Sequence, residues 1–310
     1  MSPAHGFRGR NVVSADDFSK DDLLGLLDAS AFYEGDVGPR LAGKILGTLF
    51  FEPSTRTRLS FESAMHRLGG SVVGFSDAKM SSLSKGESLA DTIRVVESYC
   101  DAIVIRHPME GAARLAAETA HVPVINGGDG SNQHPTQTFL DLYTIRKATG
   151  RLDGLKVAFF GDLRYGRAVH SLTKALLHFD VDLSFIGPPM LRLPAELRAL
   201  LTSRGRLGRE LDALDDAKDL DVLYVTRIQK ERFPDPAEYE KVKHGYRLDR
   251  AAAERFGPDL KILHPLPRVT EVDPDVDALP GALYFEQAKN GVTVRKALLS
   301  LLLSAAPPGG

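Results

Sequence analysis

The chain has 310 residues, 43% of them hydrophobic and 26% charged, values typical of a globular protein with about two domains of ~150 residues each. Its net charge of −2 argues against a general electrostatic attraction to nucleic acid or to a membrane surface. The single cysteine, Cys100, excludes an intrachain disulfide and a cysteine metal cluster, and it fits the reducing cytoplasm.

Short apolar segments alternate with helical patterns along both halves of the chain. The predicted strands are Lys44–Phe51, Ser71–Phe75, Ala102–Ile105 and Val122–Ile125, then Lys156–Phe160, Asp182–Ile186, Val222–Val225 and Lys261–Leu263. Helical patterns lie between most of them, for example at Ser88–Cys100, Gly111–Ala120 and Ala168–Phe179. This alternation predicts an α/β fold with two doubly wound parallel-sheet domains, each sheet covered by helices on both faces.

One predicted helix joins the two domains, and a second predicted helix ends the chain. The joining helix is expected over Pro135–Lys147, and an amphipathic stretch over Tyr284–Leu303 is expected to pack back on the first half. We therefore assign residues 1–134 and 290–310 to one domain and residues 135–289 to the other. The N-terminal segment does not resemble a signal peptide, and the C-terminal apolar run is too short to span a bilayer.

The first predicted strand ends abruptly in hydroxyl and arginine side chains. The apolar run Ile45–Phe51 is followed by Ser54, Thr55, Arg56 and Thr57, and a helical pattern then runs on to two glycines. A helix N-terminus offers free backbone N–H groups and partial positive charge, to which these side chains add further donors. The segment therefore predicts a site for a phosphate dianion, the alternative being an ordinary serine cap beside a solvated arginine.

Polar motifs follow the other predicted strands as well. In chain order these motifs contain Arg106, His134 with Gln137, Arg167, Arg227, and the turn His264–Arg268. Because open α/β sheets bind ligands at the carboxyl ends of their strands, both halves are predicted to direct these side chains toward one cleft. Four arginines around one cleft favour strongly anionic ligands such as a phosphate and a dicarboxylate, although any one of them alone would more often form a surface ion pair.

The chemistry predicted at this cleft is direct transfer between two bound ligands. His134 is suited to donate to a carbonyl oxygen that becomes an oxyanion, although a histidine at a helix start also commonly bonds to backbone. The chain has no G-x-S-x-G serine motif, its histidines are dispersed, and Gly161 and Gly166 lack the spacing of a nicotinamide-binding turn. We therefore expect neither a metal nor a cofactor, and catalysis by positioning and charge stabilisation.

Taken together, the motifs resemble the aspartate/ornithine carbamoyltransferase family over roughly residues 7 to 303. Phe51–Arg58 is similar to the carbamoyl-phosphate signature of that family. The later motifs, Ser81–Glu87, Arg106–Pro108, Gly128–Gln137, Tyr165–Arg167, Thr226–Arg232 and His264–Arg268, resemble its aspartate-specific branch. The resemblance implies transfer of the carbamoyl group of carbamoyl phosphate to the amino group of L-aspartate, which gives N-carbamoyl-L-aspartate and phosphate for pyrimidine synthesis.

The resemblance also implies roles for individual residues. Those expected to bind carbamoyl phosphate are Ser54, Thr55, Arg56, Thr57, Ser81, Lys85, Arg106, His134, Gln137, Pro265 and Leu266. Among them, Thr55, Arg106 and His134 would stabilise the oxyanion, while Arg56 and Lys85 would hold the departing phosphate. The residues expected to bind aspartate are Arg167 and Arg227, which would clamp its two carboxylates, with Lys85, Gln229 and Leu266 beside them.

The family's catalytic unit is a trimer with shared active sites at its subunit interfaces. The resemblance implies that Ser81 and Lys85 enter the active site of a neighbouring subunit. Glu52 would bridge the domains to Arg167 and Arg232 in a closed form. Whether the chain works alone, with a regulatory chain or with a dihydroorotase partner stays open.

Two alternatives compete with this interpretation. An ornithine carbamoyltransferase would be expected to carry a cysteine in the 264–267 turn, and Arg227 would repel the ammonium group of ornithine. A non-catalytic scaffold subunit would be expected to lack Arg56, His134 or Lys85, all of which are present. One departure from the family pattern is Thr270, which stands where an aspartate often follows Pro-Arg-Val.

Overall fold

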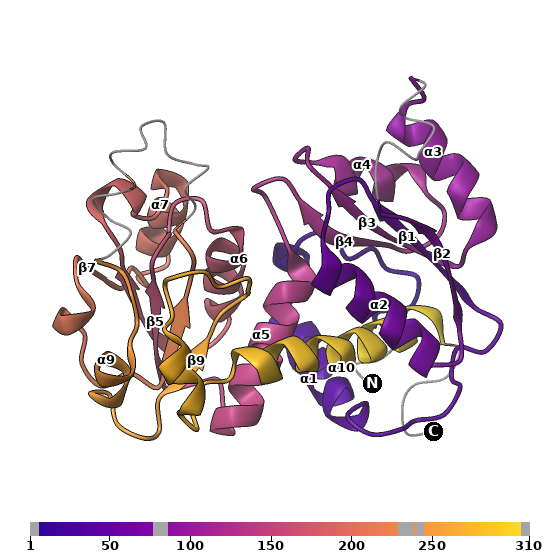
Figure 1. The fold of residues 1–310 in the computed structure, drawn as a ribbon. Helices are drawn as coiled ribbons and strands as arrows, with labels where there is room; N and C mark the ends of the chain where they lie inside the picture. Colours follow the sequence, from indigo (N-terminus) through magenta and orange to yellow (C-terminus); the bar gives the residue numbers. More distant parts are fainter. Residues whose placement is uncertain (1–5, 77–85, 229–238, 240–244, 305–310) are drawn as a thin grey trace. The chain divides into compact units, whose positions relative to one another are not determined.

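The computed structural model describes residues 6–76, 86–228, 239 and 245–304 (Figure 1). The chain forms two compact units, Met1–Tyr143 with Lys289–Gly310, and Thr144–Ala288. Each unit contains one parallel β-sheet with helices packed against it, which confirms the predicted α/β fold class. The division falls inside helix α5 (Pro135–Thr149), whereas the sequence assigns that whole helix to the second domain.

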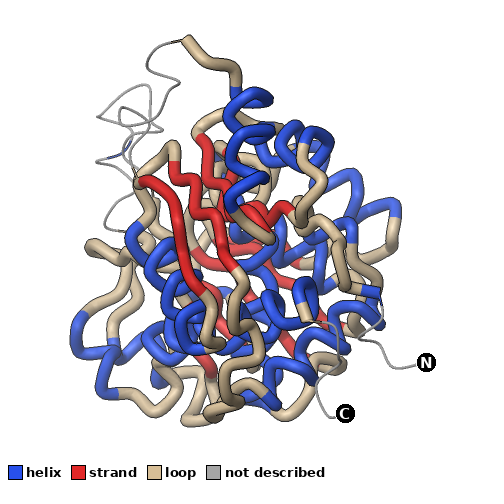
Figure 2. The backbone as a smooth tube through the Cα atoms, turned by 90° about the vertical axis from the view of Figure 1, so that its right-hand side faces the viewer, coloured by secondary structure: helices blue, strands red, loops and turns tan. Residues whose placement is uncertain are grey.

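The sheet of the first unit has the strand order β2-β1-β3-β4, and all of its strands are parallel. These strands are β1 (Ile45–Phe50), β2 (Ser71–Phe75), β3 (Ala102–His107) and β4 (Val124–Asp129). The described helices of the chain up to α5 are α1 (Lys20–Phe32), α2 (Thr55–Arg67), α3 (Leu89–Val96) and α4 (Ala112–Thr119), and Figure 2 shows strands flanked by helices. The central strands are buried on both faces, which explains their nearly continuous apolar sequences.

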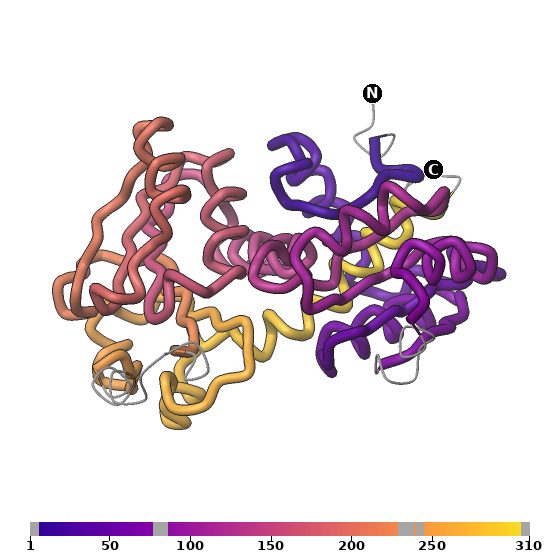
Figure 3. Tube along the Cα trace, turned by 90° about the horizontal axis from the view of Figure 1, so that it is seen from above, coloured from indigo at the N-terminus to yellow at the C-terminus, as the bar shows by residue number. Residues whose placement is uncertain are grey.

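Most of helix α10 (Tyr284–Leu303) belongs to the first unit, because that unit includes the chain from Lys289 onward. Its end lies beside the start of the chain, where the Gly9 N–H donates a hydrogen bond to the Leu302 carbonyl at 3.1 Å (Figure 3). The predicted packing of this stretch on the first half is therefore confirmed. No helix in the described ranges is long and apolar enough to cross a membrane.

The sheet of the second unit has the strand order β7-β6-β5-β8-β9, again parallel throughout. Its strands are β5 (Leu155–Phe160), β6 (Val181–Ile186), β7 (Arg209–Leu211), β8 (Val222–Val225) and β9 (Lys261–Leu263). The described helices of this unit after α5 are α6 (Arg167–Leu176), α7 (Ala195–Ser203) and α9 (Arg250–Glu254). Strand β7 is absent from the prediction because this short edge strand, Arg-Glu-Leu, has no apolar run.

The segment that ends at Cys100 differs in part from its prediction. The helix expected over Ser88–Cys100 ends earlier, at Val96, and continues as a 3-10 turn over Glu97–Tyr99. Cys100 follows this turn as a buried side chain, and burial raises the pKa of its thiol to about 11. A thiol with that pKa is protonated at neutral pH, which supports a packing role for Cys100 rather than a role as a nucleophile.

Each sheet reverses its strand order at one point, between β1 and β3 in the first unit and between β5 and β8 in the second. The register places Phe50 beside Arg106 at the first of these points and Phe160 beside Val225 at the second. In open parallel sheets, ligands bind just beyond the carboxyl ends of the strands at such a reversal. The segments after β1, β3, β5 and β8 therefore lie where this fold class places its ligands.

Gly161 shows how tightly the second of these points is packed. It follows β5 with φ +118°, and a Cβ atom there would lie 2.2 Å from the Thr226 carbonyl oxygen. The N–H of Gly161 also donates to the Ile186 carbonyl at 2.9 Å. The glycine is thus required by the close approach of two strand ends, an explanation that does not involve a nucleotide.

We expect Gly161→Ala to lower the free energy of unfolding by about 3 kcal/mol or more, since it adds both backbone strain and a clash. Gly154→Ala is the matched control, because Gly154 has φ +73° but a Cβ atom there would have no neighbour within 4 Å. The control substitution should lower the free energy of unfolding by only about 1 kcal/mol. Urea unfolding followed by circular dichroism measures both, and equal losses would contradict close packing as the reason for Gly161.

Candidate active site

The N-terminus of α2 is built to attract an anion. Ser54 is its N-cap residue but makes no side-chain capping hydrogen bond, so the hydroxyl is not consumed by the helix. The first turn, Thr55 to Thr57, contains no acidic residue that would neutralise the helix dipole. Burial lowers the pKa of the Arg56 guanidinium, yet an arginine remains protonated at neutral pH. Backbone N–H groups, hydroxyls and a cation are therefore concentrated at this helix end.

Arg106 lies at the end of the neighbouring strand β3, and its side chain is buried. Its Nη1 donates to the Gly127 carbonyl oxygen at 3.1 Å, and its Nη2 lies 3.2 Å from Glu52 Oε2 in an ion pair. These contacts fix the guanidinium beside the segment that leads into α2. The predicted bridge from Glu52 to Arg167 and Arg232 concerns a closed form and stays a prediction.

The loop that follows β4 is organised around the carboxylate of Asp129, which is 1% exposed. One of its oxygens accepts hydrogen bonds from Asn126 Nδ2 (2.9 Å) and the Gln133 N–H (3.1 Å), and the other accepts from the Gly111 N–H at 3.0 Å. This loop leads to His134, which is also buried and immediately precedes α5. Asp129 thus fixes the path of the backbone that presents the imidazole.

The register of the sheet brings the α2 N-terminus, Arg106 and the loop that leads to His134 to one edge. Arg106 pairs with Phe50 of β1, and His107 pairs with Asp129 of β4, so β1, β3 and β4 end side by side. Parallel strands carry their carboxyl ends on the same side of the sheet. The residues that follow these strands, and that the sequence predicts to bind carbamoyl phosphate, therefore lie at the carboxyl edge of one sheet.

A second set of predicted residues follows strands β5 and β8 in the other unit. The buried Asp162 accepts hydrogen bonds from the backbone N–H groups of Arg164 (3.0 Å) and Tyr165 (2.9 Å), which shapes the loop before α6. Arg167 is the first residue of that helix. The Thr226 hydroxyl donates to the Asp162 carbonyl at 3.2 Å, which ties the segment before Arg227 to the same loop.

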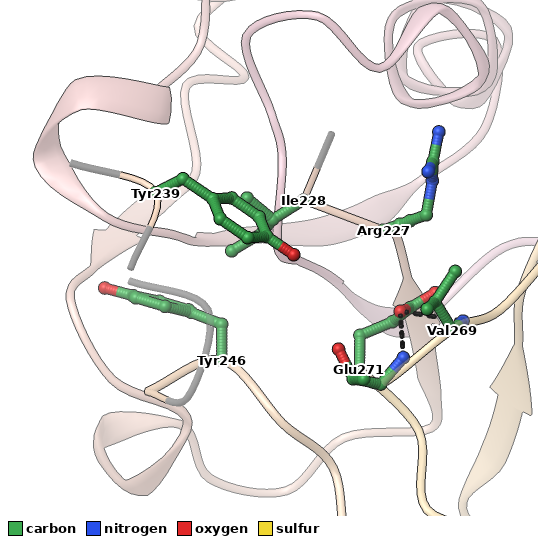
Figure 4. A pocket seen from close by; sticks show the side chains of 7 residues that line it. Arg227, Ile228, Tyr239, Tyr246, Val269 and Glu271 are labelled. Carbon is green, nitrogen blue, oxygen red and sulfur yellow. Dashed lines mark hydrogen bonds between the residues drawn. The ribbon is translucent and has the colours of Figure 1, made fainter. Parts of the chain in front are cut away.

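A small pocket lies next to Arg227 (Figure 4). Figure 4 shows the Arg227 side chain extending away from the rings of Tyr239 and Tyr246, with Glu271 on the neighbouring segment. The residues that line the pocket are Arg227, Ile228, Tyr239, Tyr246, Val269, Thr270 and Glu271. Thr270, the noted departure from the family pattern, thus lies in the same pocket as a predicted aspartate-binding arginine.

The segment after β9 is held by a buried pair, His264 and Glu271. His264 Nδ1 accepts a hydrogen bond from the Leu266 N–H at 2.8 Å, so its Nε2–H donates to Glu271 Oε1, also at 2.8 Å. Burial alone would raise the pKa of Glu271, but hydrogen bonds from His264 and from backbone N–H groups hold it below its usual value. The pair thereby fixes Leu266, whose φ of +54° is rare for a branched residue.

Four residues named in the sequence analysis, Ser81, Lys85, Gln229 and Arg232, lie outside the described residues. That the first and second sets share one cleft also stays a prediction. Within the described ranges, no group of three or more histidine, cysteine, aspartate or glutamate side chains could hold a metal ion.

Two family models match the chain in succession. The carbamoyl-phosphate-binding domain of the aspartate/ornithine carbamoyltransferases matches residues 10–147, and the aspartate/ornithine-binding domain matches residues 153–302. The chain belongs to the aspartate/ornithine carbamoyltransferase family. The aspartate carbamoyltransferase catalytic subunit of Thermococcus onnurineus is 58% identical over 303 residues, covering 96% of this chain and 98% of the relative.

Solved structures of this carbamoyltransferase family share the fold. The catalytic subunit of aspartate transcarbamoylase from Methanocaldococcus jannaschii matches with a TM-score of 0.89 and 55% identity, covering 94% of this chain and 97% of that one. Aspartate transcarbamoylase from Trypanosoma cruzi in complex with carbamoyl phosphate and aspartate matches with a TM-score of 0.90 and 39% identity, covering 97% of this chain and 99% of that one.

Several residues that shape the site were not predicted from the sequence. Three buried carboxylates accept hydrogen bonds from backbone N–H groups in the loops that carry predicted ligand-binding residues: Asp129, Asp162 and Glu271. The one available signal was their position, since each lies within or next to a motif that follows a strand. Their burial, which decides their role, is not visible in the sequence.

Proposed function

We propose that this chain catalyses the transfer of the carbamoyl group of carbamoyl phosphate to the amino group of L-aspartate, giving N-carbamoyl-L-aspartate and phosphate. The observation that carries the proposal is the arrangement of the α2 N-terminus, Arg106 and the loop leading to His134 along the carboxyl edge formed by the neighbouring strands β1, β3 and β4. The high similarity to aspartate carbamoyltransferase catalytic subunits along nearly the whole chain supports the same reaction.

In the proposed site the phosphate of carbamoyl phosphate binds at the α2 N-terminus. Ser54, Thr55, Arg56 and Thr57 supply backbone and side-chain donors to its oxygens, as expected of an anion at a helix N-terminus. The carbonyl oxygen of the carbamoyl group lies toward Thr55, Arg106 and His134. Backbone atoms of Pro265 and Leu266 orient the reacting groups, and no metal or cofactor takes part.

The reaction is an acyl-type substitution at the carbamoyl carbon. The deprotonated amino group of aspartate attacks this carbon, a new C–N bond forms, and the carbonyl oxygen becomes a tetrahedral oxyanion stabilised by Thr55, Arg106 and His134. The C–O bond to phosphate then breaks, and Arg56 with Lys85 holds the departing charge. The phosphate is the acceptor of the amine proton, so catalysis needs positioning and charge stabilisation rather than a separate base.

Charge explains why aspartate rather than ornithine is the proposed acceptor. Arg167 and Arg227 are placed after β5 and β8, and two guanidinium groups suit the two carboxylates of aspartate. The ammonium group of an ornithine side chain would meet a like charge at Arg227. Lys85 and Gln229 complete the proposed aspartate site beside Leu266.

We further propose that the working unit is a homotrimer in which Ser81 and Lys85 serve the site of a neighbouring subunit. Strand β2 supports a subunit interface, because an edge strand with an exposed apolar side chain is open to a second chain, and Val73 is 41% exposed. Val73 lies on β2, an edge strand of its sheet. A regulatory chain or a dihydroorotase partner and a cytoplasmic location remain predictions.

Steady-state assays with carbamoyl phosphate test the proposed reaction directly. With the purified chain, we expect product with L-aspartate and none with L-ornithine, and we expect succinate to inhibit because it retains both carboxylates. Product with ornithine would overturn the assignment of Arg167 and Arg227. Product with neither acceptor, from a folded trimer, would favour the scaffold alternative.

Substitutions in the phosphate and oxyanion sites should separate their roles. Arg56→Ala should abolish turnover because the phosphate loses its principal cation. His134→Ala should lower kcat by ~10²-fold or more, the scale of one lost oxyanion donor. Arg67→Ala, at the exposed end of the same helix α2, is the control and should retain activity. Near-normal turnover by the His134 variant would remove that residue from the mechanism.

Hybrid trimers test whether the sites are shared. Equal amounts of Lys85→Ala and Arg56→Ala chains, each inactive alone, should recover roughly a quarter of wild-type activity after random exchange, because one site in each mixed trimer is intact. Native mass spectrometry can verify the exchange. No recovery in mixtures with proven exchange would mean that Lys85 and Arg56 act within one subunit.

A further inference from the structure

The side-chain amide of Gln137 is held in one orientation by Asp141. Gln137 lies in the first turn of α5, and its Nε2 donates a hydrogen bond to Asp141 Oδ1 at 2.8 Å, one helical turn away. Asp141 is fully buried. An ionised carboxylate only accepts hydrogen bonds, so the amide nitrogen must face it, and the amide oxygen of Gln137 must face away.

A buried cation supports Asp141 in this role. Arg295, on α10, is 3% exposed, and the nearby Asp141 charge favours its protonated form. Burial lowers the pKa of Arg295 to about 10, so the guanidinium is still charged at neutral pH. A positive charge therefore lies near the carboxylate that accepts the hydrogen bond from Gln137.

Arg295 is itself fixed by its surroundings in the first unit. Its Nη2 donates to the Thr136 hydroxyl at 3.2 Å, and its guanidinium lies 4.7 Å from the centre of the Phe61 ring on α2. A Cβ atom at Gly291 would lie 2.5 Å from Nη1, so a glycine one turn earlier on α10 leaves the required space. The arginine therefore contacts both helices that carry proposed carbamoyl-phosphate-binding residues.

We infer that Asp141 is a positioning residue that makes the site selective for the amino group of a carbamoyl substrate, by holding the amide oxygen of Gln137 toward it. This inference rests on the proposed function and on the expectation that Gln137 is one of the residues that bind carbamoyl phosphate. A carbamoyl NH2 group donates hydrogen bonds and would be accepted by this oxygen. The methyl group of an acetyl phosphate has no proton to donate, and would leave the oxygen unpaired.

Two stable analogues distinguish the amino group from the rest of the substrate. Phosphonoacetamide carries a phosphonate, a carbonyl and an NH2 group, whereas phosphonoacetone has a methyl in place of NH2. By isothermal titration calorimetry, we expect the Kd of the wild-type chain for phosphonoacetamide to be lower than its Kd for phosphonoacetone by about 10-fold or more. A site built to accept a hydrogen bond rejects an analogue that lacks the donor. Failure of both analogues to bind would count against the proposed function itself.

Asp141→Asn tests the positioning role, because an asparagine can donate as well as accept and no longer fixes the Gln137 amide. The preference for phosphonoacetamide should fall to within ~3-fold, while phosphonoacetone affinity stays within ~3-fold of wild type. Asp101→Asn is the matched control: Asp101 accepts from the Ile45 N–H in the same unit, and its loss should leave the preference unchanged. An unchanged preference in Asp141→Asn, or an equal loss for both analogues, would overturn the inference.

Gln137→Met provides a second test, which stands alone if Asp141→Asn does not fold and extends to the double variant if it does. Methionine matches the length of glutamine but has no amide, and Gln137 is only partly buried. This variant should lose the same preference, and adding Asp141→Asn to it should cause no further selective loss, because the two residues act through one hydrogen bond. A Gln137→Met chain that keeps the full preference would also overturn the inference.

Discussion

The strand order of the first sheet is the constraint on which the proposed site depends. Strands β1, β3 and β4 are hydrogen-bonded neighbours that run in the same direction, so their carboxyl ends lie along one edge. The register then places Arg106 beside Phe50, one short segment before the α2 N-terminus. The backbone hydrogen bonds of the sheet thus bring the segments that carry Arg56 and His134, about 80 positions apart in the chain, to the same edge.

Buried carboxylates keep the loops at both sheet edges in place. Asp129 and Asp162 each accept backbone N–H groups of the loop that carries a predicted ligand-binding residue, and Glu271 does the same beyond β9. Burying a carboxylate is costly unless hydrogen bonds offset the lost hydration, and these oxygens have such donors. These carboxylates therefore hold the backbone of the loops through hydrogen bonds. Arg56, which lies at a helix end without acidic residues, stays available to an anionic ligand.

Apolar periodicity and position after strands were enough to predict much of the fold and many of the proposed site residues. Strands β1 and β5 have long apolar runs, and the arginines that follow strands could be assigned from the order of residues alone. Strand β7 could not be predicted, because an edge strand of only three residues needs no apolar run. The roles of Asp129 and Asp141 could not be predicted either, since they depend on burial and on hydrogen-bond partners that only tertiary packing supplies.

The most direct test of the account is a crystal structure of the chain with N-(phosphonacetyl)-L-aspartate, a compound that joins both substrates in one molecule. We expect the phosphonate at the N-terminus of α2, contacting Ser54 and Arg56, and the carbonyl oxygen within hydrogen-bond distance of Arg106 and His134. The two aspartate carboxylates should then lie at Arg167 and Arg227. A phosphonate bound elsewhere, or carboxylates that contact neither arginine, would contradict the account.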